Sequence, residues 1–252
     1  MAPKNARARI IQPPPFGYTR SERSKQTLSR KFHIYPYFRF TLPNSHLLIP
    51  TMGRTSDAKE RLLDAMVELM WERSYGSLTI DIICEQAGVK KGSFYYFFKS
   101  KLELGIAAVD HIWAAIQPKL DTRYSPSRPS LEALSEHMHH TFHKASESQK
   151  EHGRVLGCPF FNLGAEISTI EPELAEKVNC MLNRYQRYIE SAVNQALSDG
   201  SISDVDSKKA GRIIFNLCEG MLTQARIKND PEVLKDLPPA VASILGLKEL
   251  PS

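Results

Sequence analysis

The chain has 252 residues, of which 42% are hydrophobic and 24% are charged, and its formal net charge is +5. This composition is ordinary for a globular protein, and because no run of 18 apolar residues occurs, it excludes a membrane-spanning helix. The four cysteines are scattered without a CxxC pair, which argues against a zinc site or a disulfide framework and favours a reducing, cytoplasmic compartment.

Residues 1–51 differ from the rest of the chain. They hold nine Lys or Arg residues against one acid, Glu22, and seven prolines, so this segment carries +8 and the remainder −3. A basic, proline-rich composition is typical of disorder, and the segment lacks the apolar core of a signal peptide. Two interpretations stay open: a basic arm with nonspecific affinity for a nucleic acid, or an extension that is not translated because the true start is Met52.

The first predicted helix covers residues 56–74. Ser56 can cap it, and Asp57 and Glu60 lie in its first turn, where the helix dipole favours acids. Apolar residues at helical spacing form the face that this helix should bury, namely Leu62, Leu63, Met66, Leu69 and Met70.

Two short helices with a tight turn between them are predicted for residues 79–98. Thr79 is a good N-cap for the first of them, and Gly88 ends it because glycine accepts the left-handed conformation. The second helix begins at Lys90 or Lys91 and ends near Phe98. A helix, a short turn containing glycine and a second helix is the helix-turn-helix pattern, whose second helix enters the major groove of DNA.

The second short helix has the chemistry that this role requires. Phe94 and Phe98 are one turn apart and should pack inward, which leaves polar groups on the other face. Lysines neutralise phosphates, hydroxyl groups donate to them, and a glycine at the helix start permits close approach. The predicted DNA-facing residues of this stretch are Lys90, Lys91, Gly92, Ser93, Tyr95, Tyr96 and, beyond it, Lys101.

The stretch from Arg54 to Leu104 resembles the tetracycline-repressor (TetR) family of bacterial transcriptional regulators. The resemblance rests on Thr79, on Ala87-Gly88-Val89, on the run from Lys91 to Tyr96, and on Phe98-Lys99-Ser100-Lys101 with Leu104. It implies a three-helix DNA-binding domain over residues 52–104, to which Arg54 and Thr79 also contribute DNA contacts. Two positions depart from the family pattern: Lys90 stands where a small capping residue is common, and Tyr96 stands where a histidine is common. The family's usual beginning also matches the sequence from Met52.

The remaining predicted elements are helices as well, since no stretch alternates with period two for long enough to make a strand. A connecting helix runs from Ser100, which forms a capping box with Glu103, to Gln117, before Pro118. Residues 118–129 form a loop. Further helices are predicted over residues 130–149, 156–167, 172–199, 204 or 206–229, and 231–245. The fold class is therefore all-α, with a helix-turn-helix domain joined to a larger helical body over residues 105–252.

The resemblance assigns the body to effector binding and dimerisation. The C-terminal helices should pair with their copies, so that two recognition helices reach the two halves of a palindromic operator in double-stranded DNA. A small-molecule effector of unknown identity should bind between the helices. The candidate pocket residues are Trp113, Phe142, Cys158, Phe161, Asn162 and Tyr185.

The predicted function is that of a repressor released from its operator by an effector. A transcriptional activator of the same fold stays open. Cys158 stands at a predicted helix N-terminus, where the dipole lowers a thiol pKa, so a redox or electrophile sensor is a further alternative, and an enzyme using Cys158 as nucleophile is a remote one. No cofactor is expected, and no metal site either, because His139 and His143 lack a third ligand.

Overall fold

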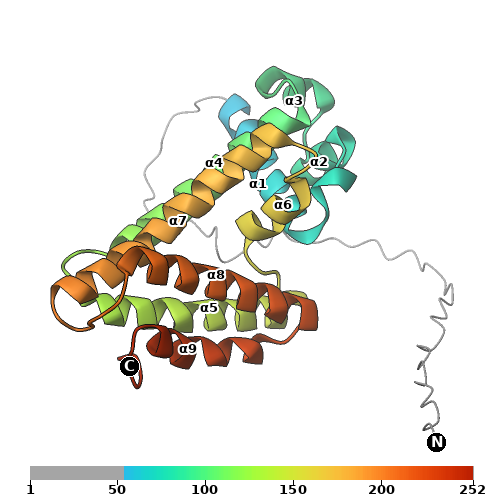
Figure 1. The fold of residues 1–252 in the computed structure, drawn as a ribbon. Coiled ribbons are helices and arrows are strands. Elements are labelled where there is room, and N and C mark those ends of the chain that lie inside the picture. Colours follow the sequence, from blue (N-terminus) through green and yellow to red (C-terminus); the bar gives the residue numbers. More distant parts are fainter. Residues whose placement is uncertain (1–53, 252) are drawn as a thin grey trace, which may run out of the picture. The chain divides into compact units, whose positions relative to one another are not determined.

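The computed structural model describes residues 54–251, with the backbone alone for 54–56. The two interpretations of residues 1–51, and the start at Met52, therefore fall outside the described residues. Every regular element from Arg54 onward is helical, as predicted (Figure 1). The N-terminal elements are α1 (Arg54–Glu72), the 3-10 helix η1 (Tyr75–Ser77), α2 (Ile80–Ala87) and α3 (Lys91–Phe97).

The caps predicted for the helix-turn-helix are confirmed. The Thr79 hydroxyl accepts a hydrogen bond of 3.3 Å from the Ile82 N–H, and Gly88 ends α2 in the left-handed conformation with φ of 62°. Helix α1 packs on both α2 and α3. The side chains that meet between them are fully buried and apolar: Leu62, Met66, Ile83 and Phe94. Local capping and one small core thus fix the angle between α2 and α3.

The connecting helix α4 (Lys101–Arg123) is longer than predicted, because it continues through Pro118 instead of ending before it. The loop predicted over residues 118–129 is wrong in its first half. Proline in a helix interior removes a backbone hydrogen bond. Here burial outweighs that local cost, since the side chains of Leu120 and Arg123 beyond the proline are buried. Thr122 also donates a hydrogen bond of 2.9 Å to the Pro118 carbonyl.

The body consists of α5 (Ser130–His152), α6 (Pro159–Ile167), α7 (Pro172–Ser198), α8 (Ser207–Lys228), η2 (Pro231–Asp236) and α9 (Leu237–Ile244). The single helix predicted over residues 231–245 is therefore wrong in its first part, which is a 3-10 turn. Figure 1 shows α7 running beside α4, while α5, α8 and α9 lie together. None of the described helices is long and apolar enough to cross a membrane.

Helices α7 and α8 pack closely against each other. Gly211 of α8 lies so near Glu190 of α7 that an added Cβ would stand 2.7 Å from the Glu190 Cα. Only glycine permits this approach without a shift of backbone. The core beneath the pair is formed with α5, η2 and α9, and its fully buried side chains include Leu134, Met138, Ile189, Val193, Ile214, Leu237 and Val241.

Candidate nucleic-acid interface

Helix α3 presents the predicted polar face to solvent. Phe94 is fully buried beneath it, whereas Tyr95 and Tyr96 are 57% and 72% exposed. Lys90, the N-cap, and Lys91 are exposed as well, and Ser93 is half-buried. Lys90 makes no side-chain cap, so its departure from a small capping residue leaves the first turn of α3 without a side-chain acceptor. The structure thus brings Lys90 to Ser93, Tyr95 and Tyr96 together on one short helix.

Lys91 has a partner that the sequence analysis missed. Its Nζ lies 2.7 Å from Oδ1 of Asp81, in the first turn of α2, and both side chains are exposed. The hydrogen bond to Asp81 raises the Lys91 pKa, so the ammonium stays charged. The carboxylate therefore holds the cation on the exposed surface that α2 and α3 share, where the sequence predicts DNA contacts.

Two other predicted DNA-binding residues lie elsewhere or cannot be placed. The Lys101 ammonium donates a 3.1 Å hydrogen bond to the Tyr75 carbonyl and lies 4.2 Å from the centre of the Tyr75 ring. It thus joins the start of α4 to η1 and is half-buried, apart from the exposed face of α3. The Arg54 side chain falls outside the described residues. The DNA contacts of Lys101, Arg54 and Thr79 stay predictions.

Helix α6 connects the body to the helix-turn-helix. Glu166 accepts hydrogen bonds from the Ser74 hydroxyl at 2.5 Å, the Tyr75 N–H at 2.9 Å and the Gly76 N–H at 2.8 Å. Burial opposes ionisation of Glu166, but these hydrogen bonds and the charge of Lys101 hold its pKa below the usual value. The carboxylate is therefore ionised, and its three hydrogen bonds tie α6 to η1, the turn that leads into α2.

The two residues just before α6, Gly157 and its N-cap Cys158, make two further contacts. The indole N–H of Trp71 in α1 donates a 3.0 Å hydrogen bond to the Gly157 carbonyl. Next to it, the buried Cys158 thiol hydrogen-bonds to Glu219 of α8. The lowered thiol pKa predicted for Cys158 is wrong. Burial and the neighbouring Glu219 raise it well above its ordinary value, so the thiol stays protonated, contrary to what a nucleophile requires.

The remaining effector-pocket candidates do not converge on one place. The Trp113 ring packs near Tyr188, and Tyr185 packs against His137 and Phe215. Phe142 lies beneath the Lys235 ammonium, 5.5 Å from it. In α6, Asn162 donates a hydrogen bond to the Leu156 carbonyl, and its neighbour Phe161 is half-buried. Tyr124 contacts both Tyr188 and His137, so Trp113 and Tyr185 belong to one aromatic cluster of α4, α5, α7 and α8, and the α6 residues are not part of it.

Comparison with known proteins accounts for both halves of the described chain. Residues 62–108 match the family of bacterial regulatory proteins of the tetR family, and residues 131–240 match the tetracyclin repressor-like C-terminal domain. The transcriptional regulator AcuR of Cereibacter sphaeroides is 28% identical over 178 residues, 70% of this chain and 80% of AcuR. The repressor NemR of Escherichia coli is 23% identical over 196 residues, 75% of this chain and 94% of NemR.

Solved structures agree with this assignment. The reduced form of E. coli NemR superposes with a TM-score of 0.68 at 22% identity, over 78% of this chain and 99% of NemR. A regulatory protein TetR from Rhodobacter sphaeroides superposes with a TM-score of 0.67 at 25% identity, over 74% of this chain and 98% of that protein. The resemblance seen in residues 54–104 thus extends through the body. The chain belongs to the TetR family of DNA-binding transcriptional regulators.

Proposed function

We propose that the chain is a homodimeric repressor that leaves a palindromic operator when a small-molecule effector binds its body. The exposed face of α3 is the observation that carries this proposal, because it combines two lysines with two tyrosines over a buried phenylalanine. The relative NemR is named a repressor. On this proposal, residues 52–104 bind DNA, and residues 105–252 bind the effector and form the dimer.

A stripe along α8, exposed apart from the half-buried Leu217, supports dimerisation through the C-terminal helices. Ile213, Leu217, Gly220, Gln224 and Ile227 follow at alternating spacings of four and three, which places them on one side of the helix. Ile227 is 78% exposed, and no side chain lies within 4 Å of a Cβ added at Gly220. Two copies of α8 can therefore approach closely at Gly220 and cover the isoleucines. A two-fold dimer matches a palindromic site.

Helix α6 offers a path from the body to the DNA. Its start contacts α8 through Cys158 and Glu219, and its other end holds η1 through Glu166. An effector that binds more tightly to a shifted position of α6 would move η1 and hence α2 and α3. Binding of effector and binding of DNA would then oppose each other by the same coupling free energy.

Operator binding tests the proposal. Fluorescence anisotropy of the purified protein on DNA from upstream of its own gene is compared with random DNA over a salt series. We expect specific binding that Lys91→Ala weakens, with the salt slope reduced by about one, and that Tyr95→Ala weakens by about 1–3 kcal/mol. Lys208→Ala, which removes an exposed lysine of α8, is the matched control and should leave affinity unchanged.

If the protein bound the upstream DNA and random DNA with equal affinity, the operator would be sought by selecting genomic fragments that bind the protein. If no fragment were selected, or if both α3 variants bound as tightly as the control, the proposal would fail. With an operator in hand, release by an effector is the next measurement: a candidate compound should dissociate the complex at constant salt.

A further inference from the structure

Two polar atoms inside the aromatic cluster of α4, α5, α7 and α8 have no hydrogen-bond partner among the described residues. One is the hydroxyl oxygen of Tyr124, the residue that follows α4, and the other is Nδ1 of His137 in α5. The two rings lie 5.9 Å apart between their centres, and both atoms are shielded from solvent. A polar atom buried without a partner is rare in native proteins, because it gives up its hydrogen bond to water and gains none in return. Two such atoms in neighbouring rings point to a partner from outside the chain.

Two other polar rings of the same cluster do have partners. The Trp113 indole N–H donates a 2.8 Å hydrogen bond to Oε1 of Gln117, and the Tyr188 hydroxyl donates to the Asp121 carboxylate. Polar groups of this cluster can therefore be satisfied by side chains of α4. The hydroxyl of Tyr124 and Nδ1 of His137 are not, although they lie in the same set of rings.

Both of these side chains are neutral at pH 7. Burial, with smaller contributions from the charges of Arg123 and His140, lowers the pKa of His137 to about 3. Burial also raises the pKa of the Tyr124 hydroxyl well above its ordinary value. A neutral imidazole and a neutral phenol form hydrogen bonds but no ion pairs. They therefore suit a ligand group that donates or accepts a hydrogen bond without carrying a charge.

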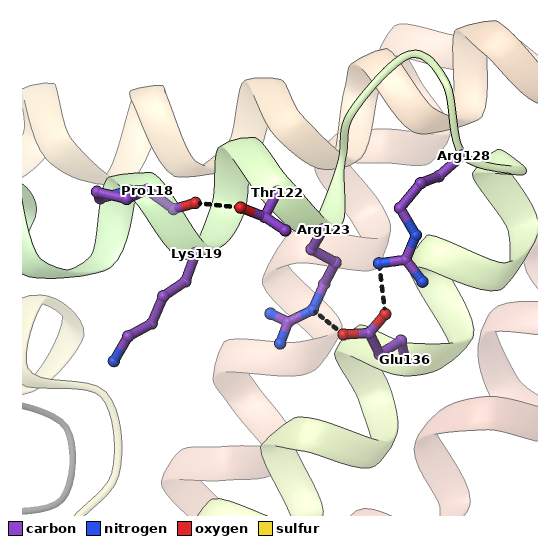
Figure 2. A pocket seen from close by; sticks show the side chains of 6 residues that line it. All are labelled: Pro118, Lys119, Thr122, Arg123, Arg128 and Glu136. Carbon is purple, nitrogen blue, oxygen red and sulfur yellow. Dashed lines mark hydrogen bonds and ion pairs between the residues drawn. The ribbon is translucent and has the colours of Figure 1, made fainter. Parts of the chain in front are cut away.

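The cation next to Tyr124 in the chain, Arg123, is held by a carboxylate. In the pocket shown in Figure 2, its Nε lies 3.3 Å from one oxygen of Glu136, and an Arg128 Nη lies 2.7 Å from the other oxygen. Arg123 is only 8% exposed, so solvent screens this pairing little. An anionic ligand in the cluster would have to compete with Glu136 for Arg123, whereas a neutral ligand would not.

The remaining rings of the cluster suit an aromatic ligand. Tyr185 lies 5.7 Å from His137 and 5.8 Å from Phe215 between ring centres, with the ring planes tilted by 72° and 55°. Tilted rings at this distance attract one another, and a further ring would be attracted in the same way. Tyr124, Tyr185 and Tyr188 are half-buried, so the cluster borders the surface of the body. Rotation of a tyrosine at that border gives a small molecule access to the buried atoms.

We propose that the aromatic cluster binds a small, neutral aromatic molecule that carries a hydroxyl group, with Tyr124 and His137 as its hydrogen-bonding partners. A hydroxyl group both donates and accepts, so it satisfies the Tyr124 hydroxyl and either tautomer of the His137 imidazole. As an effector site the cluster rests on the proposed function: Tyr124 ends α4, and α4 packs on α1 of the DNA-binding domain. Binding of the ligand itself requires no DNA.

Saturation-transfer NMR titrations of the full chain without DNA test the proposal with three probes of similar size: benzyl alcohol, toluene and benzoate. We expect saturable binding of benzyl alcohol, about tenfold tighter than that of toluene, which lacks the hydroxyl group. Benzoate, which is charged, should bind more weakly than benzyl alcohol. Tyr124→Phe and His137→Phe should each reduce the preference for benzyl alcohol over toluene by about threefold to tenfold.

Tyr188→Phe is the matched control, because it removes a hydroxyl of the same cluster that already has a partner in Asp121. It should lower the urea concentration at the midpoint of unfolding and keep the preference for benzyl alcohol. Tyr124→Phe should do the reverse, since its hydroxyl has no hydrogen bond to lose within the described chain. This readout separates ligand recognition from a structural role of Tyr124.

The proposal would be overturned if benzyl alcohol bound no more tightly than toluene. It would also be overturned if Tyr188→Phe reduced the preference as much as Tyr124→Phe does. Either result would leave operator binding by the parent protein untouched, so the proposed repressor function would stand. Conversely, a protein that selected no DNA fragment but preferred benzyl alcohol through Tyr124 would retain this binding site and lose the repressor function.

Discussion

Among single residues, Glu219 links the stability of the body to pH. Burial raises the pKa of its carboxyl from 4.5 to about 7, and the Cys158 thiol, which donates to it, only partly offsets that effect. Between these two values the native state holds a proton that the unfolded chain has released. The free energy of unfolding therefore falls as pH rises through this window, by up to about 3 kcal/mol.

Glu219→Gln should remove this dependence, because the amide keeps the shape of the acid and never ionises. We expect the variant to exceed the parent in unfolding free energy by up to about 3 kcal/mol at pH 8 and by much less at pH 5. Urea denaturation at both pH values measures it, with the exposed Glu249→Gln as control. If the variant and the parent differed in unfolding free energy by the same amount at pH 5 and pH 8, Glu219 would not be the group that titrates between these values. His137, whose low pKa weakens both proteins in acid, cancels in this comparison.

Asp81 should restrain DNA binding through its ion pair with Lys91. Asp81→Asn frees the ammonium for phosphate and removes a negative charge from the DNA-facing surface. We expect operator affinity to rise by about threefold to tenfold at low salt, with the gain shrinking as salt screens the charges. Anisotropy titrations measure this effect. Glu85→Gln, which removes an exposed acid of the same helix, is the comparison, and an equal gain there would remove any special role for Asp81.

At the scale of elements, sequence reasoning succeeded where the determinants are local. The start of α2 at Thr79, its end at Gly88 and the inward face of α3 depend on neighbours within one or two turns, and all three are confirmed. The end of α4 was mispredicted because the local penalty of Pro118 is outweighed by burial of Leu120 and Arg123 against other helices. The spacing of apolar residues within one helix does not show which surface of another helix will cover them.

In the candidate site, too, the features set by neighbouring residues could be predicted and the contacts between distant residues could not. The residues of α3 that are predicted to face DNA follow from a short motif, and the structure leaves them exposed or half-buried. By contrast, the contacts of Glu166 with residues 74–76 join positions about ninety residues apart in the chain, and neither end has a distinguishing pattern. Cys158 and Glu219 are also distant in the chain, and burial of the thiol together with this contact raises the Cys158 pKa that the helix start alone predicts to be lowered.

Glu166 supports the strongest prediction about an element. Glu166→Gln keeps the size of the side chain but cannot accept three hydrogen bonds as an anion does, so the backbone N–H groups of Tyr75 and Gly76 lose an ionised acceptor. We expect faster amide hydrogen exchange at these two residues and a loss of about 1–3 kcal/mol in unfolding free energy. Glu173→Gln, in the exposed first turn of α7, is the control. Unchanged exchange at η1 would mean that α6 does not hold it.

For the whole molecule, the proposed dimer makes the surface of α8 decide whether two DNA-binding domains act together. A monomer gains nothing from the exposed isoleucines on this helix, whereas a dimer buries them around Gly220. Each copy then brings one α3, and the operator affinity contains contributions from both half-sites. The oligomeric state and the DNA affinity should therefore change together when this surface is altered.

Ile227→Glu tests that dependence by placing a charge on the surface where the copies of α8 should meet. We expect analytical ultracentrifugation to show a monomer at concentrations at which the parent is a dimer, because an unpaired charge in an interface is costly to desolvate. Operator affinity should fall by at least a hundredfold, while binding to random DNA changes little. Ile170→Glu is the matched control, since Ile170 is 56% exposed but lies between α6 and α7. A dimeric Ile227→Glu protein with unchanged operator affinity would place the dimer interface on another surface, whereas dissociation of both variants would mean that more than α8 joins the two copies.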